Sequence, residues 1–343
     1  MAKTSPMLAP PRERLAAHTH RSTRVIGWLL RTAPLRSVRL WRADWLYIAG
    51  VFMLTRLLIV FLGLLGAALF PAVGAHQTFA LQQIGGPGDW MRLFAHFDSG
   101  WYIGISHGYL LPSSGRADWL MEWAFFPLYP MALHPVAVAL SVLHVPTNTD
   151  VLAGVIVSYA AFFGSLIYLY RLIAAELSLA SARRGIFYVA IFPTAIFFSA
   201  VYPESLFLFM TVGAFYHARR RQWALAGLLT AGALLTRPQG LFLLAPLVLE
   251  FVAAWREGRG GAERRNGRLL KGLWLGLPLV ALGGYALYSH AETGYWFAFS
   301  VSATQARGTG SRLRRIRSCA SCWLRRSAAP FRTISARSTS PWR

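Results

Sequence analysis

The sequence predicts an all-α, polytopic integral membrane protein. Hydrophobic residues make up 55% of the 343 residues and charged residues only 14%, and the mean hydropathy is +0.42, which is unusual for a water-soluble domain. Apolar runs of spanning or near-spanning length recur between residues 45 and 290. Arginine clusters flank these runs, so the formal charge of +22 indicates membrane topology. Binding of nucleic acid would need the basic residues on one folded face and is not expected.

The first 44 residues form a basic segment that we expect in the cytoplasm. An apolar run at residues 45–70 follows; it is too long for a signal peptide and predicts a retained spanning helix. Further apolar segments lie at about 124–143, 151–170, 186–201, 204–217, 223–236, 240–254 and 273–290. The shorter ones are joined by turns that contain proline. They predict paired helices that meet at membrane depth, where an irregular turn is tolerated if it lines a protein cavity.

Three basic groups are expected on the cytoplasmic side under the positive-inside rule: Arg171–Arg184, Arg219–Arg221 and Arg256–Lys271. The large first loop, about residues 71–123, then lies outside the plasma membrane. The turns VYPES (Val201–Ser205) and TRPQG (Thr236–Gly240) share that extracytoplasmic side. Residues 124–170 do not fit, because two full crossings there would place Arg171–Arg184 outside. Either the segment with FFPLYP and Pro135 lies along or dips into the membrane surface, or this loop breaks the rule.

Residues 301–343 differ in composition from the rest of the chain. Ten arginines and no acid follow Ala303. The chain has 33 Arg against 2 Lys, as a GC-rich gene would encode, and an out-of-frame reading of such a gene gives a similar mixture. We therefore expect a frameshifted, truncated or disordered end, with an anionic-lipid-binding tail as the alternative. Cys319 and Cys322 form a lone CxxC here and predict neither a disulfide framework nor a metal site.

Asp98 is the main candidate for chemistry. It stands in HFDSGWYIGISHGY, residues 96–109, beside Phe97, Trp101 and Tyr102. Aromatic neighbours desolvate a carboxylate, which raises its pKa and suits it to act as a general base. Asp98 followed by a serine and a glycine equally fits a helix N-cap, but its place in the first loop favours catalysis.

Four further charged residues have both a functional and a structural interpretation. Arg56 interrupts the first spanning run, which is costly unless it pairs, faces a polar cavity or snorkels to the surface. Arg237 in TRPQG fits either a lipid phosphate or an interfacial anchor. Glu204 in VYPES suits the start of a helix. Glu122 fits an anchor at a helix start as well as a substrate contact.

The sequence contains no phosphate-binding P-loop, no dinucleotide-binding glycine motif after a strand, no HExxH and no usable GxSxG. Soluble nucleotide chemistry is therefore not predicted. His96 and His107 lack the spacing of metal ligands on one helix, so no metal ligand is predicted. We expect no obligatory cofactor, and the sequence leaves a divalent metal open.

HFDSGWYIGISHGY, AFFPLYP, the run from FPTAIFF through VYPES to TRPQG, and TRLL around Arg56 together resemble the bacterial branch of the GPI mannosyltransferase II family. The resemblance spans about residues 45–300. It implies a membrane glycosyltransferase of the GT-C type with a polyprenyl-phosphate sugar donor. The acid of the family's first loop corresponds to Asp98, and its aromatic partner to Trp101. The implied substrate contacts are Arg56, His96, Trp101, Tyr102, Glu122, Tyr129, Tyr202, Glu204, Arg237 and Gln239.

The resemblance implies an inverting displacement in which Asp98 takes the proton of the acceptor hydroxyl. Arg237, with Arg56, would hold the leaving lipid phosphate. A mannosyl or other hexosyl group would pass to an extracytoplasmic glycolipid, glycan or protein. A lipid or solute transporter with Arg56 and Glu204 in its path is the competing interpretation, although no repeat of the first-loop motif occurs. An inactive truncated product is a third.

Overall fold

The computed structural model describes residues 39–69, 90–114, 119–257 and 270–301. These residues form helices and no strand, which confirms the all-α class. Most of the basic N-terminal segment, residues 70–89 of the first loop and the tail from residue 302 lie outside the described residues. The elements are α2 (Arg42–Leu69), η2 (Trp90–Phe94), α4 (Ser99–Ser106), η3 (Pro112–Ser114), α5 (Trp119–Glu122), α6 (Leu128–Val142), α7 (Thr149–Glu176), α8 (Leu179–Ile191), η4 (Pro193–Phe198), α9 (Glu204–Arg219), α10 (Trp223–Thr236), η5 (Pro238–Leu243), α11 (Leu244–Glu257), η6 (Leu273–Gly276) and α13 (Leu277–Thr293).

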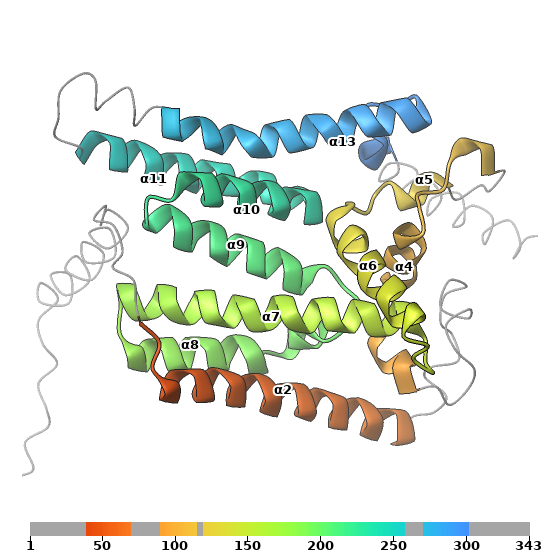
Figure 1. The fold of residues 1–343 in the computed structure, drawn as a ribbon, viewed down its shortest axis with the longest axis horizontal. Coiled ribbons are helices and arrows are strands. Elements are labelled where there is room, and N and C mark those ends of the chain that lie inside the picture. Colours follow the sequence, from red (N-terminus) through yellow and green to blue (C-terminus); the bar gives the residue numbers. More distant parts are fainter. Residues whose placement is uncertain (1–38, 70–89, 115–118, 258–269, 302–343) are drawn as a thin grey trace, which may run out of the picture.

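The long helices lie side by side in a bundle (Figure 1), with α2, α7, α8, α9, α10, α11 and α13 running lengthwise. Short connections at residues 177–178 and 220–222 reverse the chain, so α7 and α8, and likewise α9 and α10, are antiparallel. Among the residues that the structure describes, four stretches are long and apolar enough to cross a membrane: residues 42–69, 149–176, 238–256 and 270–293. The chain is therefore a multi-pass membrane protein.

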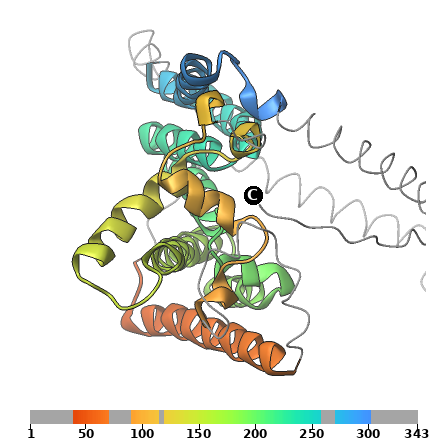
Figure 2. The same cartoon turned by 90° about the vertical axis from the view of Figure 1, so that its right-hand side faces the viewer.

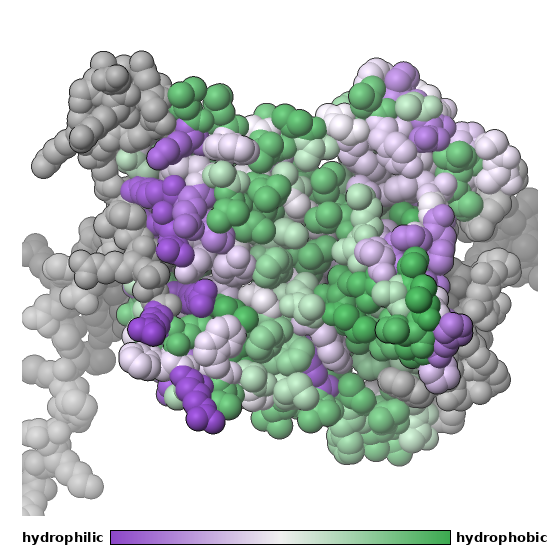
Figure 3. Space-filling view, in the orientation of Figure 1, coloured by the Kyte–Doolittle hydropathy of each residue, from purple (hydrophilic) through white to green (hydrophobic). Residues whose placement is uncertain are grey.

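One end of the bundle collects the arginines that connect the helices, seen as the hydrophilic cluster at the left of Figure 3. Arg219 at the end of α9 binds Glu176 of α7 at 2.7 Å and Glu250 of α11 at 2.8 Å. Arg183 of α8 lies 3.5 Å from Asp44 at the start of α2. These ion pairs join the ends of the lengthwise helices at the basic end of the bundle.

The direction of α6 bears on the two interpretations of residues 124–170. It lies across the other end of the bundle in both ribbon views and does not run lengthwise (Figures 1 and 2). Only α7 then runs the length of the bundle between the first loop and Arg171–Arg184. This geometry favours the interpretation in which the segment with FFPLYP does not cross the bundle, and the side of the membrane on which Arg171–Arg184 lies stays a prediction.

A buried cluster joins the first loop to the helix bundle. Its members come from η2, α4, α6, α7 and the turn before α9, and include Phe94, Tyr102, Tyr129, Val201 and Tyr202. Helix α7 can lie close to the VYPES turn because it has a glycine at the contact. A Cβ at Gly154 would lie 2.6 Å from Val201 Cγ1. Small residues allow such approach between membrane helices. Helix α7 is thus the support on which the loop and the VYPES turn rest.

Candidate active site

Asp98 occupies the N-cap position of α4, but its side chain makes no capping hydrogen bond. The neighbouring Ser99 makes the local hydrogen bonds: its Oγ donates to the carbonyl oxygen of His96 at 2.8 Å and accepts the His96 N–H at 3.1 Å. Because Ser99 orders this turn, the Asp98 carboxylate is left for another role. Of the two roles that the sequence suggests, the side-chain geometry argues against capping.

The turn before Asp98 is strained and pinned in place. Phe97 has a φ of +49°, a left-handed conformation that non-glycine residues adopt at a cost of about 1–3 kcal/mol, often at functional sites. Val201 donates its N–H to the Phe94 carbonyl oxygen at 2.8 Å. The Asp98 N–H donates to the Tyr202 hydroxyl oxygen, also at 2.8 Å. These bonds hold the loop against VYPES and explain how the strained turn persists.

Glu204 and Arg237 bring the VYPES and TRPQG turns together. Glu204 is the first residue of α9, behind the N-cap Pro203. Arg237 ends α10 with extended backbone angles (φ −151°, ψ 140°), so the chain leaves the helix there. One guanidinium nitrogen of Arg237 binds Glu204 Oε1 in an ion pair. The other carboxylate oxygen of Glu204 is buried and has no hydrogen-bond partner.

The charges at this end of the bundle affect Asp98. Partial burial raises the pKa of the Asp98 carboxyl, and the positive charge of Arg237 opposes that rise. Burial lowers the pKa of the His96 imidazole, opposed by a hydrogen bond to the backbone of Leu93. The raised pKa of Asp98 makes it a stronger base than an exposed aspartate. His96 stays neutral at neutral pH.

Aromatic side chains form a wall beside Asp98. Trp101 stacks on Phe125 at 6.0 Å between ring centroids. Tyr102 meets Phe125 and Tyr129 edge-on at 5.1 and 5.5 Å. Tyr129 is fully buried, and its hydroxyl lies 3.0 Å from both the Gly154 carbonyl oxygen and Ser158 Oγ on α7. Tyr102 and Tyr129 therefore contribute packing here, and a direct substrate contact for either stays a prediction.

Glu122 and Gln239 have different surroundings. Glu122 is buried, and its Oε2 accepts the Leu110 N–H at 2.7 Å, which ties the chain after α4 to α5. This contact agrees with the structural interpretation of Glu122. Gln239 is exposed in η5, two residues beyond Arg237, where it is free to meet a ligand. No contact tests the substrate role predicted for either residue.

Arg56 belongs to α2, and its side chain reaches the break between α8 and η4. It is buried, donates to the carbonyl oxygens of Ala190 and Ala195 at 3.0 Å, and donates to Ser199 Oγ at 2.8 Å. Its guanidinium carbon lies 4.5 Å from the centre of the Phe162 ring. Helix α8 ends at Ile191 and Pro193 starts η4, which leaves carbonyl groups without intrahelical donors. These contacts give Arg56 a structural role, and none of them supports a role in holding the lipid phosphate.

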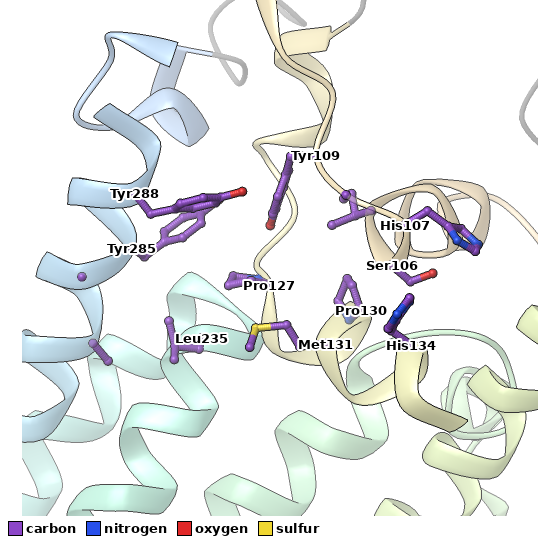
Figure 4. Close-up of a pocket in the computed structure, with 14 residues that line it drawn as sticks. Ser106, His107, Tyr109, Pro127, Pro130, Met131, His134, Leu235, Tyr285 and Tyr288 are labelled. Carbon is purple, nitrogen blue, oxygen red and sulfur yellow. The ribbon is translucent and has the colours of Figure 1, made fainter. Parts of the chain in front are cut away.

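The structure thus brings together Asp98, Tyr202, Glu204 and Arg237 from three separate stretches of sequence. A groove of about 650 Å³ lies elsewhere, lined by the end of α4 and by α6, α10 and α13 (Figure 4). None of the site residues predicted from the sequence lines it. The residues of α13 and α6 that line the groove recur at helical spacing in the sequence. That spacing alone does not reveal a groove, because the two helices must first be placed opposite each other.

Within the described ranges, no three His, Cys, Asp or Glu side chains are grouped so as to hold a metal ion. Asp98 and Glu204 belong to one electrostatic neighbourhood, since burial raises the pKa of the Glu204 carboxyl and the Asp98 charge adds to that rise, but no third ligand joins them. The expectation of no obligatory cofactor stays a prediction.

The sequence was compared with models of known protein families. A family model described as Mannosyltransferase (PIG-V) matches residues 52–294, which is more than half of the chain. The matched range contains Arg56, Asp98, Glu204 and Arg237. Neither the curated proteins nor the solved structures gave a match.

Proposed function

Because the chain belongs to the Mannosyltransferase (PIG-V) family, it is a membrane glycosyltransferase, and we propose that it moves a mannosyl group from polyprenyl-phosphate mannose to an acceptor hydroxyl. The family makes a carrier function the weaker interpretation. The observation that carries the mechanism is the Asp98 carboxylate, which makes no cap hydrogen bond and lies within the electrostatic reach of Arg237.

Asp98 acts as the general base. It takes the proton of the acceptor hydroxyl while that oxygen bonds to the anomeric carbon of the mannosyl group. The bond from the anomeric carbon to the phosphate oxygen breaks, and its electron pair leaves with the lipid phosphate. Since acceptor and phosphate occupy opposite faces of the anomeric carbon, a β-linked donor gives an α-mannoside.

Arg237 stabilises the leaving phosphate. Its ion pair with Glu204 uses one guanidinium nitrogen, and the remaining N–H groups can bind an anion as a planar fork. Glu204 orients this fork and does not protonate the leaving group. A second acid is unnecessary because a phosphate leaves readily, unlike the alcohol in glycoside hydrolysis.

The positive-inside rule supports an orientation for this reaction. The end with Arg183 and Arg219 lies in the cytoplasm, and the end with Asp98, Glu204 and Arg237 lies outside the plasma membrane. A lipid-linked donor fits that compartment because it is carried by the bilayer. The acceptor is then an extracytoplasmic glycolipid, glycan or protein.

Transfer of radiolabelled mannose from polyprenyl-phosphate mannose tests the proposal. Membranes that contain the full chain are compared with membranes that contain Asp98→Asn at equal inserted amounts. We expect transfer by the wild type and a loss of at least about a hundredfold in the variant, the range of general base catalysis. Wild-type rates in Asp98→Asn, or no transfer from mannosyl and glucosyl donors by the inserted wild type, would overturn the proposal.

A further inference from the structure

The lengthwise helices of the bundle include a long pair and a short set. Helices α2 and α7 have 28 residues each, whereas α8, α9 and α10 have 13, 16 and 14 residues. At a rise of about 1.5 Å per residue, the long pair measures about 42 Å and the short set about 20–24 Å. In Figure 1, α8, α9 and α10 end well short of the far ends of α2 and α7. The short helices therefore stop inside the bundle.

An ion pair at the basic end places the long and short helices at a common level. Arg219, the last residue of α9, binds Glu176, the last residue of α7, at 2.7 Å. Glu204 is the first residue of α9 and therefore lies about 22 Å from this level. Arg237 follows directly on α10 and lies at about 21 Å. The Glu204–Arg237 ion pair is thus at the height where the short helices end.

Contacts partway along α7 show how far this helix continues beyond the short ones. Ser158 Oγ on α7 donates to the Ala200 carbonyl oxygen, next to the VYPES turn, at 2.8 Å. Ser158 lies about 27 Å from Glu176 and about 14 Å from Thr149, the first residue of α7. Helix α7 therefore extends about 14 Å past the VYPES turn.

The short helices do not reach across an ordinary bilayer. Its hydrocarbon layer is about 30 Å thick. With the inner boundary at the Arg219 ion pairs, as in the proposed orientation, the Glu204–Arg237 pair lies about 8 Å below the outer boundary. Charged side chains at such a depth are costly unless they pair or face a polar cavity. The pair therefore needs a recess that water and a ligand can enter.

Lipid meets the short helices directly. Exposed apolar side chains include Tyr188 and Ile191 on α8, and Leu225 and Leu228 on α10. Helix α2, in contrast, stays apolar and exposed up to its last residue, Leu69. A bilayer thins around a hydrophobic segment that is too short, whereas a segment that is too long tilts. The outer boundary is therefore drawn inward where the lipid meets α8 and α10.

The first loop and α6 cover the space beyond the short helices. Helices α4 and α6 lie past the ends of α9 and α10 (Figure 1), and α6 contacts both α7 and α10. Tyr102 of α4 and Tyr129 of α6 pack in one buried cluster with Tyr202 of the VYPES turn. Asp98, at the start of α4, binds Tyr202 through its backbone N–H. The predicted base thus lies under this cover, on the same side as the VYPES turn.

We propose that Glu204 and Arg237 lie within the thickness of the hydrocarbon layer, in a recess roofed by α4 and α6, and that the thickness of the surrounding bilayer controls binding of the lipid-linked donor. This inference rests on the proposed function. A phosphate carried by a lipid resides at the outer boundary and must descend to reach Arg237. A thicker bilayer lengthens the descent and weakens donor binding, and it leaves the chemical step unchanged.

The depth of the recess is measured without catalysis. In the full chain, Cys319 and Cys322 are replaced by serine, and one new cysteine carries a fluorophore. Gln239→Cys reports on the recess, because Gln239 is exposed two residues beyond Arg237. Pro146→Cys is the matched reporter, exposed in the connection that precedes α7. Each labelled chain is placed in nanodiscs whose lipids carry a nitroxide quencher either on the headgroup or in the acyl chain.

We expect the acyl-chain nitroxide to quench the label at position 239 more strongly than the headgroup nitroxide does. The label at position 146 should show the opposite order, because it lies at the outer end of α7. Stronger quenching of both labels by the headgroup nitroxide would place the site at the membrane surface and overturn the inference.

The effect of thickness is measured on the wild-type chain. Transfer from polyprenyl-phosphate mannose is followed in nanodiscs of dimyristoleoyl, dioleoyl or dierucoyl phosphatidylcholine, which differ in acyl-chain length. The donor KM, as a mole fraction of the lipid, should rise about tenfold from the thinnest to the thickest bilayer, since each Å of mismatch costs a fraction of a kcal/mol. The kcat should stay constant. A constant KM, or a change confined to kcat, would overturn the control by thickness.

The two measurements separate this inference from the proposed function. A chain with a deep label at position 239 that transfers no mannose would contradict the proposed function and leave the recess in place. A chain that transfers mannose with the same donor KM in all three lipids would contradict the inference and leave the proposed function in place.

Discussion

The backbone N–H of Asp98 donates a hydrogen bond to the side-chain hydroxyl of Tyr202, 104 residues away in the sequence. Tyr202 stands two residues before Glu204, which binds Arg237. A single chain of contacts therefore links the predicted base to the predicted phosphate ligand. The distance between the two is set by the VYPES turn and not by the first loop alone.

Tyr202→Phe should slow mannosyl transfer by about three- to tenfold, the effect of losing one hydrogen bond of about 1 kcal/mol. The donor KM should stay unchanged, because Arg237 is not altered. Tyr47→Phe is the control, since the Tyr47 hydroxyl binds the Arg183 carbonyl oxygen at the basic end. Equal kcat values for wild type and Tyr202→Phe would show that this bond does not position the base.

The rate of transfer should fall at low pH as Asp98 takes up a proton. Burial raises its pKa above the ordinary value of about 3.9, so the acid limb of the kcat profile should lie above that value. Arg237 holds the pKa down. Arg237→Gln should therefore move the acid limb to higher pH, besides reducing the rate. A limb that stays in place in this variant would mean that Arg237 does not act on the base.

Arg56→Met should lower the stability of the purified protein by at least about 2 kcal/mol, because the carbonyl groups of Ala190 and Ala195 lose a charged donor. Thermal unfolding in detergent measures this, with the exposed Arg184→Met as the control. A variant with wild-type stability and a raised donor KM would instead support the phosphate-holding role predicted from the sequence.

Gly240→Ala should impair transfer by up to about a hundredfold, the cost of displacing a positioned group by about 1 Å. A Cβ at Gly240 would lie 2.3 Å from the backbone nitrogen of Leu234, so η5 must move away from α10, and Arg237 lies at their junction. Gly276→Ala is the matched control, with nothing within 4 Å of its Cβ. Measurement of kcat for both variants decides whether the close contact between Gly240 and α10 determines the position of Arg237.

Much of the helix order follows from hydropathy. The expected segment 223–236 coincides with α10, because basic residues precede it and a proline follows it. The expected segment 186–201 is instead divided into α8 and η4. The stabilising partner of that break is Arg56, which is 134 residues away from Ala190, so no local pattern could locate it.

The sequence predicted where the site residues lie better than it predicted which contacts their side chains make. The positive-inside rule placed Asp98, Glu204 and Arg237 at one end of the bundle, and they lie there together. The sequence could not decide whether Asp98 or Ser99 ordered the start of α4, since both residue types cap helices. It also could not pair Glu204 with Arg237, because that contact depends on the extended backbone at the end of α10.

The partners of Arg56 also bear on how the protein is made. Ala190 follows Arg56 by 134 residues, so at a synthesis rate of about 5–20 residues per second the arginine waits roughly 7–27 s for its carbonyl acceptors. During that interval α2 holds a charge that costs about 2.5–3.5 kcal/mol at the centre of an isolated helix. The leucines and isoleucines around it must keep α2 inserted until α8 arrives. The first helix therefore needs more hydrophobicity than its place in the finished bundle would demand.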